Sequence, residues 1–157
     1  MNEIMTPAFW DDVCRTYNAD IVVGNGVVDL KSRENGNIIE ITEDFYPFEI
    51  IDGETAKMNL DFKGYVEYTV SFSTQHCHFR DADDAKDYVI DIMKDEILPV
   101  EFYDKSGKRR FGGDIRKEEL SELSPESLGR IFGYGEEYMY QFVYEIHSWS
   151  GKYDKLP

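Results

Sequence analysis

Five aspartates at helical spacing in the middle of this 157-residue chain could present a row of carboxylates to a cationic partner. They are Asp83, Asp84, Asp87, Asp91 and Asp95. Steps of three or four residues stack side chains along one helix face, about 5–6 Å apart. Such a row suits either a mimic of nucleic-acid phosphates or a surface shaped for one basic protein. A solvated face of an amphipathic helix is the competing interpretation.

A second chemical candidate is the triplet His76-Cys77-His78, which strand alternation would split into two imidazoles on one face and a thiol on the other. The histidines could share a metal if a third ligand came from elsewhere. The triplet lacks the second ligand pair of zinc motifs, which favours exposed histidines at a strand end. No G-x-S-x-G, Walker loop or H-E-x-x-H motif occurs in the chain. We therefore expect a protein that is not an enzyme, with no catalytic residue, metal ligand or cofactor.

Charge is the strongest signal in the composition, with 32 acidic against 17 basic residues and a formal net charge of -15. This excess opposes the compact state by self-repulsion, and a cationic partner would relieve it. One segment departs from the trend, because residues 105–116 carry five bases and a single acid: Lys105, Lys108, Arg109, Arg110 and Arg116 against Asp114. This basic segment has three interpretations: a solvated turn that discourages edge pairing, a counter-charge that orients an acidic neighbour, and a phosphate contact. Direct nucleic-acid binding is not expected, because the surrounding field repels phosphate.

Aromatic residues indicate a folded core and offer two anchors for a partner near the C-terminus. Ten Phe, eleven Tyr and two Trp supply far more apolar surface than a disordered acidic tail holds. Trp149 and Tyr153 lie beside Gly151, and Trp and Tyr dominate interface hot spots. Both are added to the expected partner-binding residues.

The expected cellular location of the protein follows from two further features of the sequence. No apolar run approaches the roughly 18 residues that span a bilayer, and the first residues lack the pattern of a signal peptide. We expect a cytoplasmic protein without membrane contact, whose Cys14 and Cys77 are buried thiols instead of a disulfide.

The elements that position these residues are predicted to form a single α+β domain over residues 1–157, an antiparallel meander sheet with about three helices packed against it. Thr6-Pro7 begins a short helix. From Ile21 the period changes to two, and turns are predicted at Asn25-Gly26, Asn35-Gly36 and Asp52-Gly53. Residues 65–74 alternate most clearly, with Val66, Tyr68, Val70 and Phe72 facing inward. Pro47 makes residues 45–51 an edge strand.

The second half of the chain mixes helices and strands. Asp81 is predicted to cap a helix that runs to about Ile97. A hairpin follows, formed by residues 100–104 and 108–111. Ser124-Pro125-Glu126 begins another helix, which Gly133 ends. The last element is predicted to be a long strand over residues 138–149, with one aromatic-rich face: Tyr138, Tyr140, Phe142, Tyr144 and Ile146.

In size, acidity and sequence texture the chain resembles the small cytoplasmic immunity proteins that bacteria pair with secreted polymorphic toxins. The resemblance lies in the helix over residues 82–97, in Val100-Glu101-Phe102-Tyr103 and in the hairpin that ends at Phe111-Gly112-Gly113. It implies stoichiometric binding that blocks a toxin's active site or an essential surface, and it transfers no functional residue. An acidic inhibitor of a basic nuclease would associate rapidly through electrostatic steering.

Three functions are therefore carried forward. The first is a non-enzymatic acidic protein that neutralises a basic protein partner, above all an immunity protein for a toxin nuclease. The second is a nucleic-acid mimic that occupies the polynucleotide channel of a restriction or CRISPR enzyme. The third is a small metal-dependent enzyme that uses His76 and His78. The oligomeric state is left open.

Overall fold

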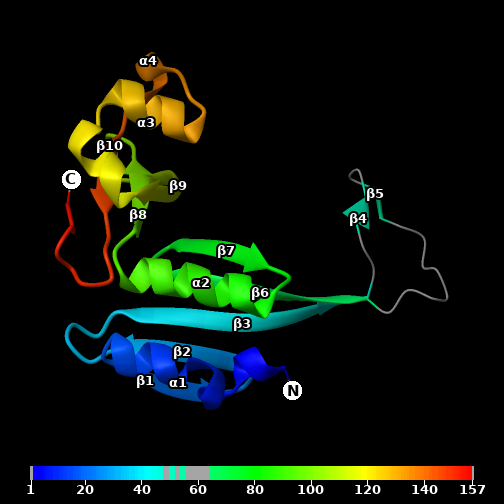
Figure 1. Ribbon diagram of the computed structural model, residues 1–157. Coiled ribbons are helices and arrows are strands. Elements are labelled where there is room, and N and C mark those ends of the chain that lie inside the picture. Colours follow the sequence, from blue (N-terminus) through cyan, green and yellow to red (C-terminus); the bar gives the residue numbers. More distant parts are fainter. Residues whose placement is uncertain (1, 48–49, 52–53, 56–63, 157) are drawn as a thin grey trace.

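The protein has an α+β fold built on two antiparallel sheets (Figure 1), as a computed structural model shows for residues 2–47, 50–51, 54–55 and 64–156. The larger sheet has five strands in the order β1-β2-β3-β6-β7, and the smaller has three in the order β10-β8-β9. Among the described residues, the helices of seven or more residues are α1, α2 and α3. The predicted fold class, a meander sheet with about three helices, is confirmed.

The five-stranded sheet is a simple meander in which each strand pairs antiparallel with the next. Its strands are β1 (Ala19–Gly24), β2 (Val27–Ser32), β3 (Ile38–Tyr46), β6 (Tyr65–Phe72) and β7 (Gln75–Phe79). Asn25 and Gly26 connect β1 to β2 with φ values of 55° and 75°, the backbone that a two-residue type I′ turn requires. The predicted inward face of β6 is also confirmed, because Tyr68, Val70 and Phe72 are buried.

The prediction that Pro47 makes residues 45–51 an edge strand is wrong. β3 is a central strand, and its last residues Phe45 and Tyr46 pair with Val66 and Tyr65 of β6. Pro47 follows the last ladder pair, so it ends the strand without removing a ladder hydrogen bond. Beyond it, β4 (Ile50–Ile51) and β5 (Glu54–Thr55) pair in a separate two-stranded sheet. The predicted turn at Asp52-Gly53 lies outside the described residues.

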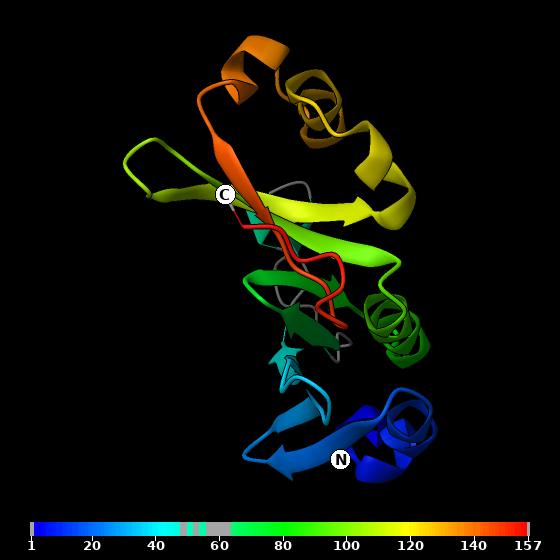
Figure 2. The same cartoon turned by 90° about the vertical axis from the view of Figure 1, so that its left-hand side faces the viewer.

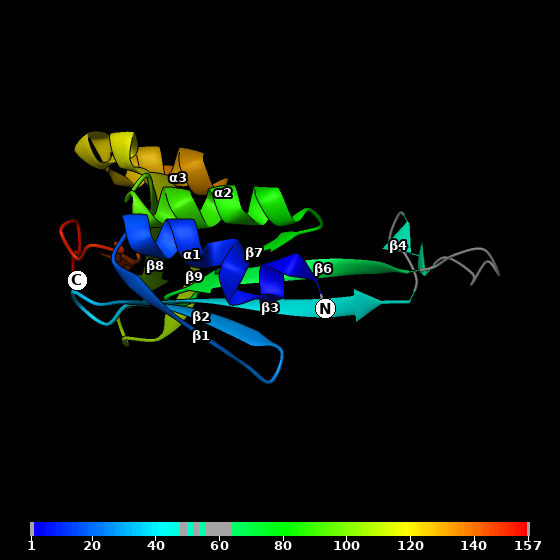
Figure 3. The same ribbon diagram turned by 60° about the horizontal axis from the view of Figure 1, so that its bottom comes forward.

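Two helices cover one face of the five-stranded sheet (Figure 3). α1 (Pro7–Thr16) follows the short 3₁₀ helix η1 (Glu3–Met5), and α2 (Ala82–Met93) follows β7. Proline occupies the first turn of α1 as predicted, although the Thr6 hydroxyl donates to Glu3 O and does not cap the helix. Their apolar sides and the inward residues of the sheet form the first core, which includes Trp10, Leu30, Ile41 and Val89.

α2 begins where it was predicted and ends earlier. The Asp81 carboxylate accepts hydrogen bonds from the backbone of Asp83 and Asp84, at 2.9 and 3.1 Å, and so caps the helix. The predicted end near Ile97 is wrong, because the helix stops at Met93 and Asp95 adopts a left-handed φ of 58°. Ile97 instead begins β8 (Ile97–Tyr103), whose side chains are almost all buried. Apolar residues on consecutive positions suit a strand covered on both faces, which outweighs the helical period there.

The second layer contains the smaller sheet and the remaining helices (Figure 2). β8 and β9 (Arg109–Arg116) form the predicted hairpin, which is longer than predicted at the end away from its turn, and β10 (Val143–Ile146) pairs with β8. The 3₁₀ helix η2 (Lys117–Glu122), α3 (Pro125–Phe132) and α4 (Glu136–Met139) complete the layer. α3 has the predicted Ser124 cap and ends at Gly133 with φ 78°. A second core here contains Leu98, Phe102, Ile115, Leu128, Met139 and Ile146.

The prediction of a long strand over residues 138–149 is wrong. Tyr138 lies in α4, Tyr140 follows it as an exposed residue, and the strand covers only Val143–Ile146. Tyr138 and Phe142 are four residues apart and their ring centroids lie 5.1 Å apart. An alternating aromatic pattern therefore also fits a helical turn, where residues four apart meet on one side.

The two layers meet along a seam in which β8, β9 and the C-terminal segment contact α2, β7 and the turn between β2 and β3. Tyr88 of α2 donates to Asp114 Oδ2 of β9 at 2.6 Å. Asn35 and Asn37 both donate to the carbonyl oxygen of Trp149, at 2.8 and 2.9 Å. No helix among the described residues is long and apolar enough to cross a membrane. The assignment of residues 1–157 to one domain stays a prediction.

Candidate partner-binding surface

The outer face of α2 presents three of the five aspartates singled out in the sequence. Asp83, Asp84 and Asp87 are exposed, while Ala85, Val89, Ile92 and Met93 of the same helix are buried. None of the three forms an ion pair with a base in the described part of the chain. Asp83 and Asp84 also lie in the first turn, where negative charge complements the helix dipole.

Asp91 and Asp95 differ from the other three. The Asp91 carboxylate is partly exposed, and its Oδ2 lies 3.4 Å from Arg116 Nη1 of β9. Asp95 lies beyond the end of the helix, is only 7% exposed, and accepts a hydrogen bond from the Ser150 backbone at 3.1 Å. The inclusion of Asp95 in an exposed row is thus wrong, because the helix ends before it. The row is shorter than the sequence predicted.

A surface groove between α1 and α2 extends this acidic face. Its lining includes four acids and two bases: Glu3, Asp11, Asp12 and Asp83 with Arg15 and Lys86. Lys86 Nζ donates to Phe9 O at 2.8 Å and to Asp12 Oδ1 at 3.0 Å, and it lies 4.6 Å from the centroid of the Phe9 ring. The bond from Lys86 holds the pKa of Asp12 below its usual value. Asp11 pairs with Arg15 one turn along α1.

The acids of α1 were missed by the sequence analysis. The only local signal is the i,i+4 pair of Asp11 and Arg15, which is ordinary for an exposed helix. Their contribution to the acidic face depends on the packing of α1 beside α2, over residues some seventy positions apart. We call Asp83, Asp84 and Asp87 together with this groove the helical acidic face.

The two aromatic anchors proposed at the C-terminus are not free side chains. Trp149 is only 4% exposed and belongs to the first core, with its ring 6.0 Å from that of Phe72. The expectation that it is an exposed anchor is wrong, because the C-terminal segment folds back across the seam. Tyr153 is partly exposed and packs against the second core. Lys117 Nζ and Lys152 Nζ lie 5.5 and 5.3 Å from its ring centroid.

His76 and His78 lie side by side, on the face of β7 opposite to Cys77. Their ring centroids are 5.0 Å apart, and His78 Nδ1 lies 2.9 Å from Glu67 Oε1 and 3.0 Å from Thr69 Oγ1. Among the described residues no group of three His, Cys, Asp or Glu side chains is arranged to hold a metal ion. Cys14 and Cys77 are free thiols; Cys14 is buried as predicted, whereas the prediction that Cys77 is buried is wrong, because its side chain is partly exposed on β7. Burial raises the pKa of the Cys14 thiol to about 11.

The arginines of the basic segment are held by acids of this chain. Arg109 Nε lies 3.4 Å from Oε2 of the buried Glu101, and Arg110 Nε lies 2.7 Å from Asp104 Oδ2. Hydrogen bonds from the Ser106 side chain and from the Lys108 backbone lower the pKa of Asp104 to about 2. Lys105 and Lys108 are exposed and have no ion pair in the part of the chain that the structure describes.

No known protein family, curated protein or solved structure matches this chain. The resemblance to immunity proteins therefore depends on sequence texture alone, and the candidate surface is argued from its own geometry.

Proposed function

We propose that this protein is a non-enzymatic binding protein that neutralises a cationic protein, in the manner of an immunity protein for a toxin nuclease. The observation that supports this proposal is the set of three exposed carboxylates on α2, which have no ion pair with a base among the described residues and lie beside a groove in which acids outnumber bases. Unpaired exposed carboxylates create a negative potential that accelerates the approach of a positive surface.

The geometry gives less support to a nucleic-acid mimic. A mimic needs a long, regular series of negative charges, whereas Asp91 is paired with Arg116 and Asp95 is buried. What remains is a compact acidic face of three side chains and a groove, which suits one partner better than any polynucleotide channel. Binding to a single basic protein is therefore favoured.

The proposal is tested with the product of the gene directly upstream, co-expressed with this protein in a bacterial host and purified as a complex. We expect the combined replacements Asp83→Asn, Asp84→Asn and Asp87→Asn to lower the association rate by about 3–10-fold at low salt, because steering weakens when local charge is removed. Stopped-flow fluorescence at two ionic strengths measures the rate. The difference from wild type should shrink at higher salt.

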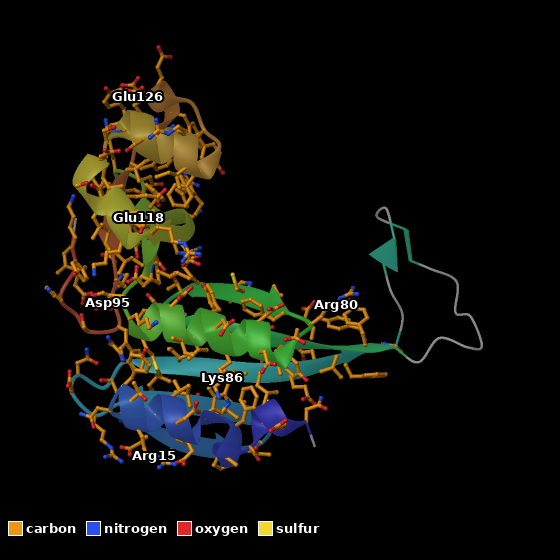
Figure 4. All side chains as sticks on the ribbon, viewed as in Figure 1. Arg15, Arg80, Lys86, Asp95, Glu118 and Glu126 are labelled. Atoms are coloured by element: carbon orange, nitrogen blue, oxygen red, sulfur yellow. The ribbon has the colours of Figure 1, made fainter. Side chains whose placement is uncertain are left out.

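A matched control variant removes three negative charges from a surface distant from α2. Glu118, Glu122 and Glu126 are exposed and belong to the second layer, where Figure 4 shows Glu118 and Glu126 well away from α2. Their combined replacement by Gln should change the association rate less than the α2 variant does. An association rate that falls equally in both variants would reject the helical acidic face, and the absence of any complex would reject the immunity role.

A further inference from the structure

The five-stranded sheet has one face without a covering layer. In Figure 2, α1 and α2 both lie to the right of this sheet, and no described helix lies to its left. Strand alternation assigns the open face to the residues that do not enter the first core. The open sheet face is formed mainly by Val22, Asp29, Lys31, Ile38, Glu40, Thr42, Asp44, Glu67, Thr69, Ser71, His76 and His78.

This face combines exposed apolar side chains with carboxylates on a rigid support. Val22 is 60% exposed and Ile38 is 44% exposed. Val22 lies opposite Asp29, and Ile38 lies opposite Lys31 in the ladder. Each of these two side chains would gain free energy if a partner that covers the face excluded water from it.

Like charges face each other twice across the open sheet face. Asp29 of β2 is the direct partner of Glu40 of β3, and Asp44 of β3 is the direct partner of Glu67 of β6. Asp29, Glu40 and Asp44 form no ion pair in the described part of the chain, and Asp29 Oδ1 is buried without a hydrogen-bond partner there. The Glu67 Oε1 atom lies 2.9 Å from Nδ1 of His78, and among the described residues Glu67 has no ion pair with a lysine or an arginine. Like charges on directly opposite residues destabilise a sheet.

Most acids at α2, with the exception of Asp87, differ from those of the sheet in what they do for the fold. Asp81 caps the helix, Asp83 and Asp84 complement its dipole, and Asp91 pairs with Arg116. Each of these roles stabilises the protein in the absence of a partner. The opposed carboxylates of the sheet do the reverse, and only a cation placed between them would turn repulsion into attraction. A local arrangement that disfavours folding is expected where function requires it.

We propose that the open sheet face is the surface on which the cationic partner docks, with lysine or arginine side chains lying between Asp29 and Glu40 and between Asp44 and Glu67. This inference rests on the proposed function and makes it more specific. The charge complementarity of two acid pairs to basic side chains identifies the partner's chemistry, and Val22 and Ile38 supply apolar contact beside them. The helical acidic face then acts during approach, and the sheet makes the lasting contact.

The docking surface can be located with a hexa-arginine peptide as the probe. The ¹⁵N-labelled full chain is titrated with the peptide at low salt, and amide shifts are mapped by two-dimensional NMR. We expect the largest shifts in β2, β3 and β6 around Asp29, Glu40 and Asp44. Shifts confined to α1 and α2 would overturn the docking surface and leave the proposed function intact. No shift anywhere would overturn both.

Two double variants separate contact from overall charge. Asp29→Asn with Glu40→Gln should weaken peptide binding about 3–10-fold and raise Tm by about 1–4 °C, because an opposed like-charge pair is removed. Asp83→Asn with Asp87→Asn removes the same charge and should weaken binding less, without the rise in Tm. A fall in Tm for the sheet variant, or equal weakening in both, would reject the docking surface.

Discussion

At the scale of single residues, the carboxyl of Asp114 at the seam between the two layers has a raised pKa. Asp114 of β9 is partly buried, with Oδ2 accepting a hydrogen bond from Tyr88 and Oδ1 without a hydrogen-bond partner among the described residues. Burial raises the pKa of Asp114 above 3.8, and the Tyr88 hydroxyl and Arg116 only partly oppose this effect. Burial and the neighbouring Asp114 also raise the pKa of Tyr88. The fold therefore favours the protonated form of the Asp114 carboxyl.

Asp114→Asn is expected to become more stabilising, relative to wild type, as the pH rises from about 3 to about 7. A group with a raised folded pKa contributes stability below its unfolded pKa and loses it as the pH passes the folded pKa. Asparagine does not titrate, so the variant avoids this loss. Urea unfolding of both proteins across the pH series measures the difference in unfolding free energy.

Asp104→Asn supplies a control of opposite sign. The pKa of Asp104 is lowered to about 2, so its contribution is present above the unfolded pKa and is lost as the pH falls. This variant should be less stable than wild type near neutral pH and approach it in acid. A difference for Asp114→Asn that stays constant, or follows the Asp104→Asn trend, would contradict a raised pKa at Asp114.

At the scale of elements, the approach of β9 to β7 depends on one glycine. A Cβ at Gly112 would lie 2.7 Å from the carbonyl oxygen of Val100 and would also collide with the Gln75 side chain. Glu101 pairs with Gly112 in the ladder, and Gln75 Nε2 and Glu101 Oε1 are both buried without hydrogen-bond partners in the described structure. The side chain of Gln75 thus fills the space that Gly112 leaves, and the two layers can meet there.

Gly112→Ala is expected to lower the free energy of unfolding by about 1–3 kcal/mol, because a backbone atom blocks the added methyl group. Gly24→Ala is the matched control. Gly24 is an exposed residue at the end of β1 whose φ is outside the left-handed region, and no atom lies within 4 Å of the added Cβ, so this substitution should leave stability unchanged within about 0.5 kcal/mol. Equal losses in the two variants would show that the close contact at Gly112 does not matter for stability.

At the scale of the whole molecule, two small cores share one strongly negative surface. One core lies between the five-stranded sheet and α1 and α2, and the other lies between the smaller sheet and the helices of the second layer. The net charge of -15 is spread over both layers, and the described ion pairs engage only a minority of the acids. Repulsion among the remaining acids opposes both cores at neutral pH.

Salt is therefore expected to stabilise the unbound protein against unfolding. Raising the NaCl concentration from about 10 mM to about 150 mM shortens the screening length from about 30 Å to about 8 Å, so Tm at neutral pH should rise. Differential scanning calorimetry measures the change. The rise should be smaller in a buffer near pH 4.5, the isoelectric point, where the net charge is close to zero. A Tm that falls with salt at neutral pH would mean that ion pairs dominate the surface.

Local chemistry made several elements predictable from the amino-acid sequence. Asp81 and Ser124 mark helix starts because a side-chain cap involves only neighbouring residues, and Asn25-Gly26 marks a turn because few residues tolerate its backbone. The alternation of residues 65–72 determined which face of β6 is buried. Sequence reasoning failed where two periods compete, as at the end of α2 and over residues 138–149.

The sequence by itself determined the α+β class, the excess of negative charge and the helix that carries Asp83, Asp84 and Asp87. Only the tertiary structure decided that Trp149 and Asp95 are buried, that α1 adds its acids beside α2, and that one face of the sheet is left open with carboxylates opposed across its strands. The physical reason is the distance along the chain over which each interaction acts. Caps, turns and net charge depend on residue type and near neighbours, whereas burial and cross-strand pairing depend on which distant segments pack together.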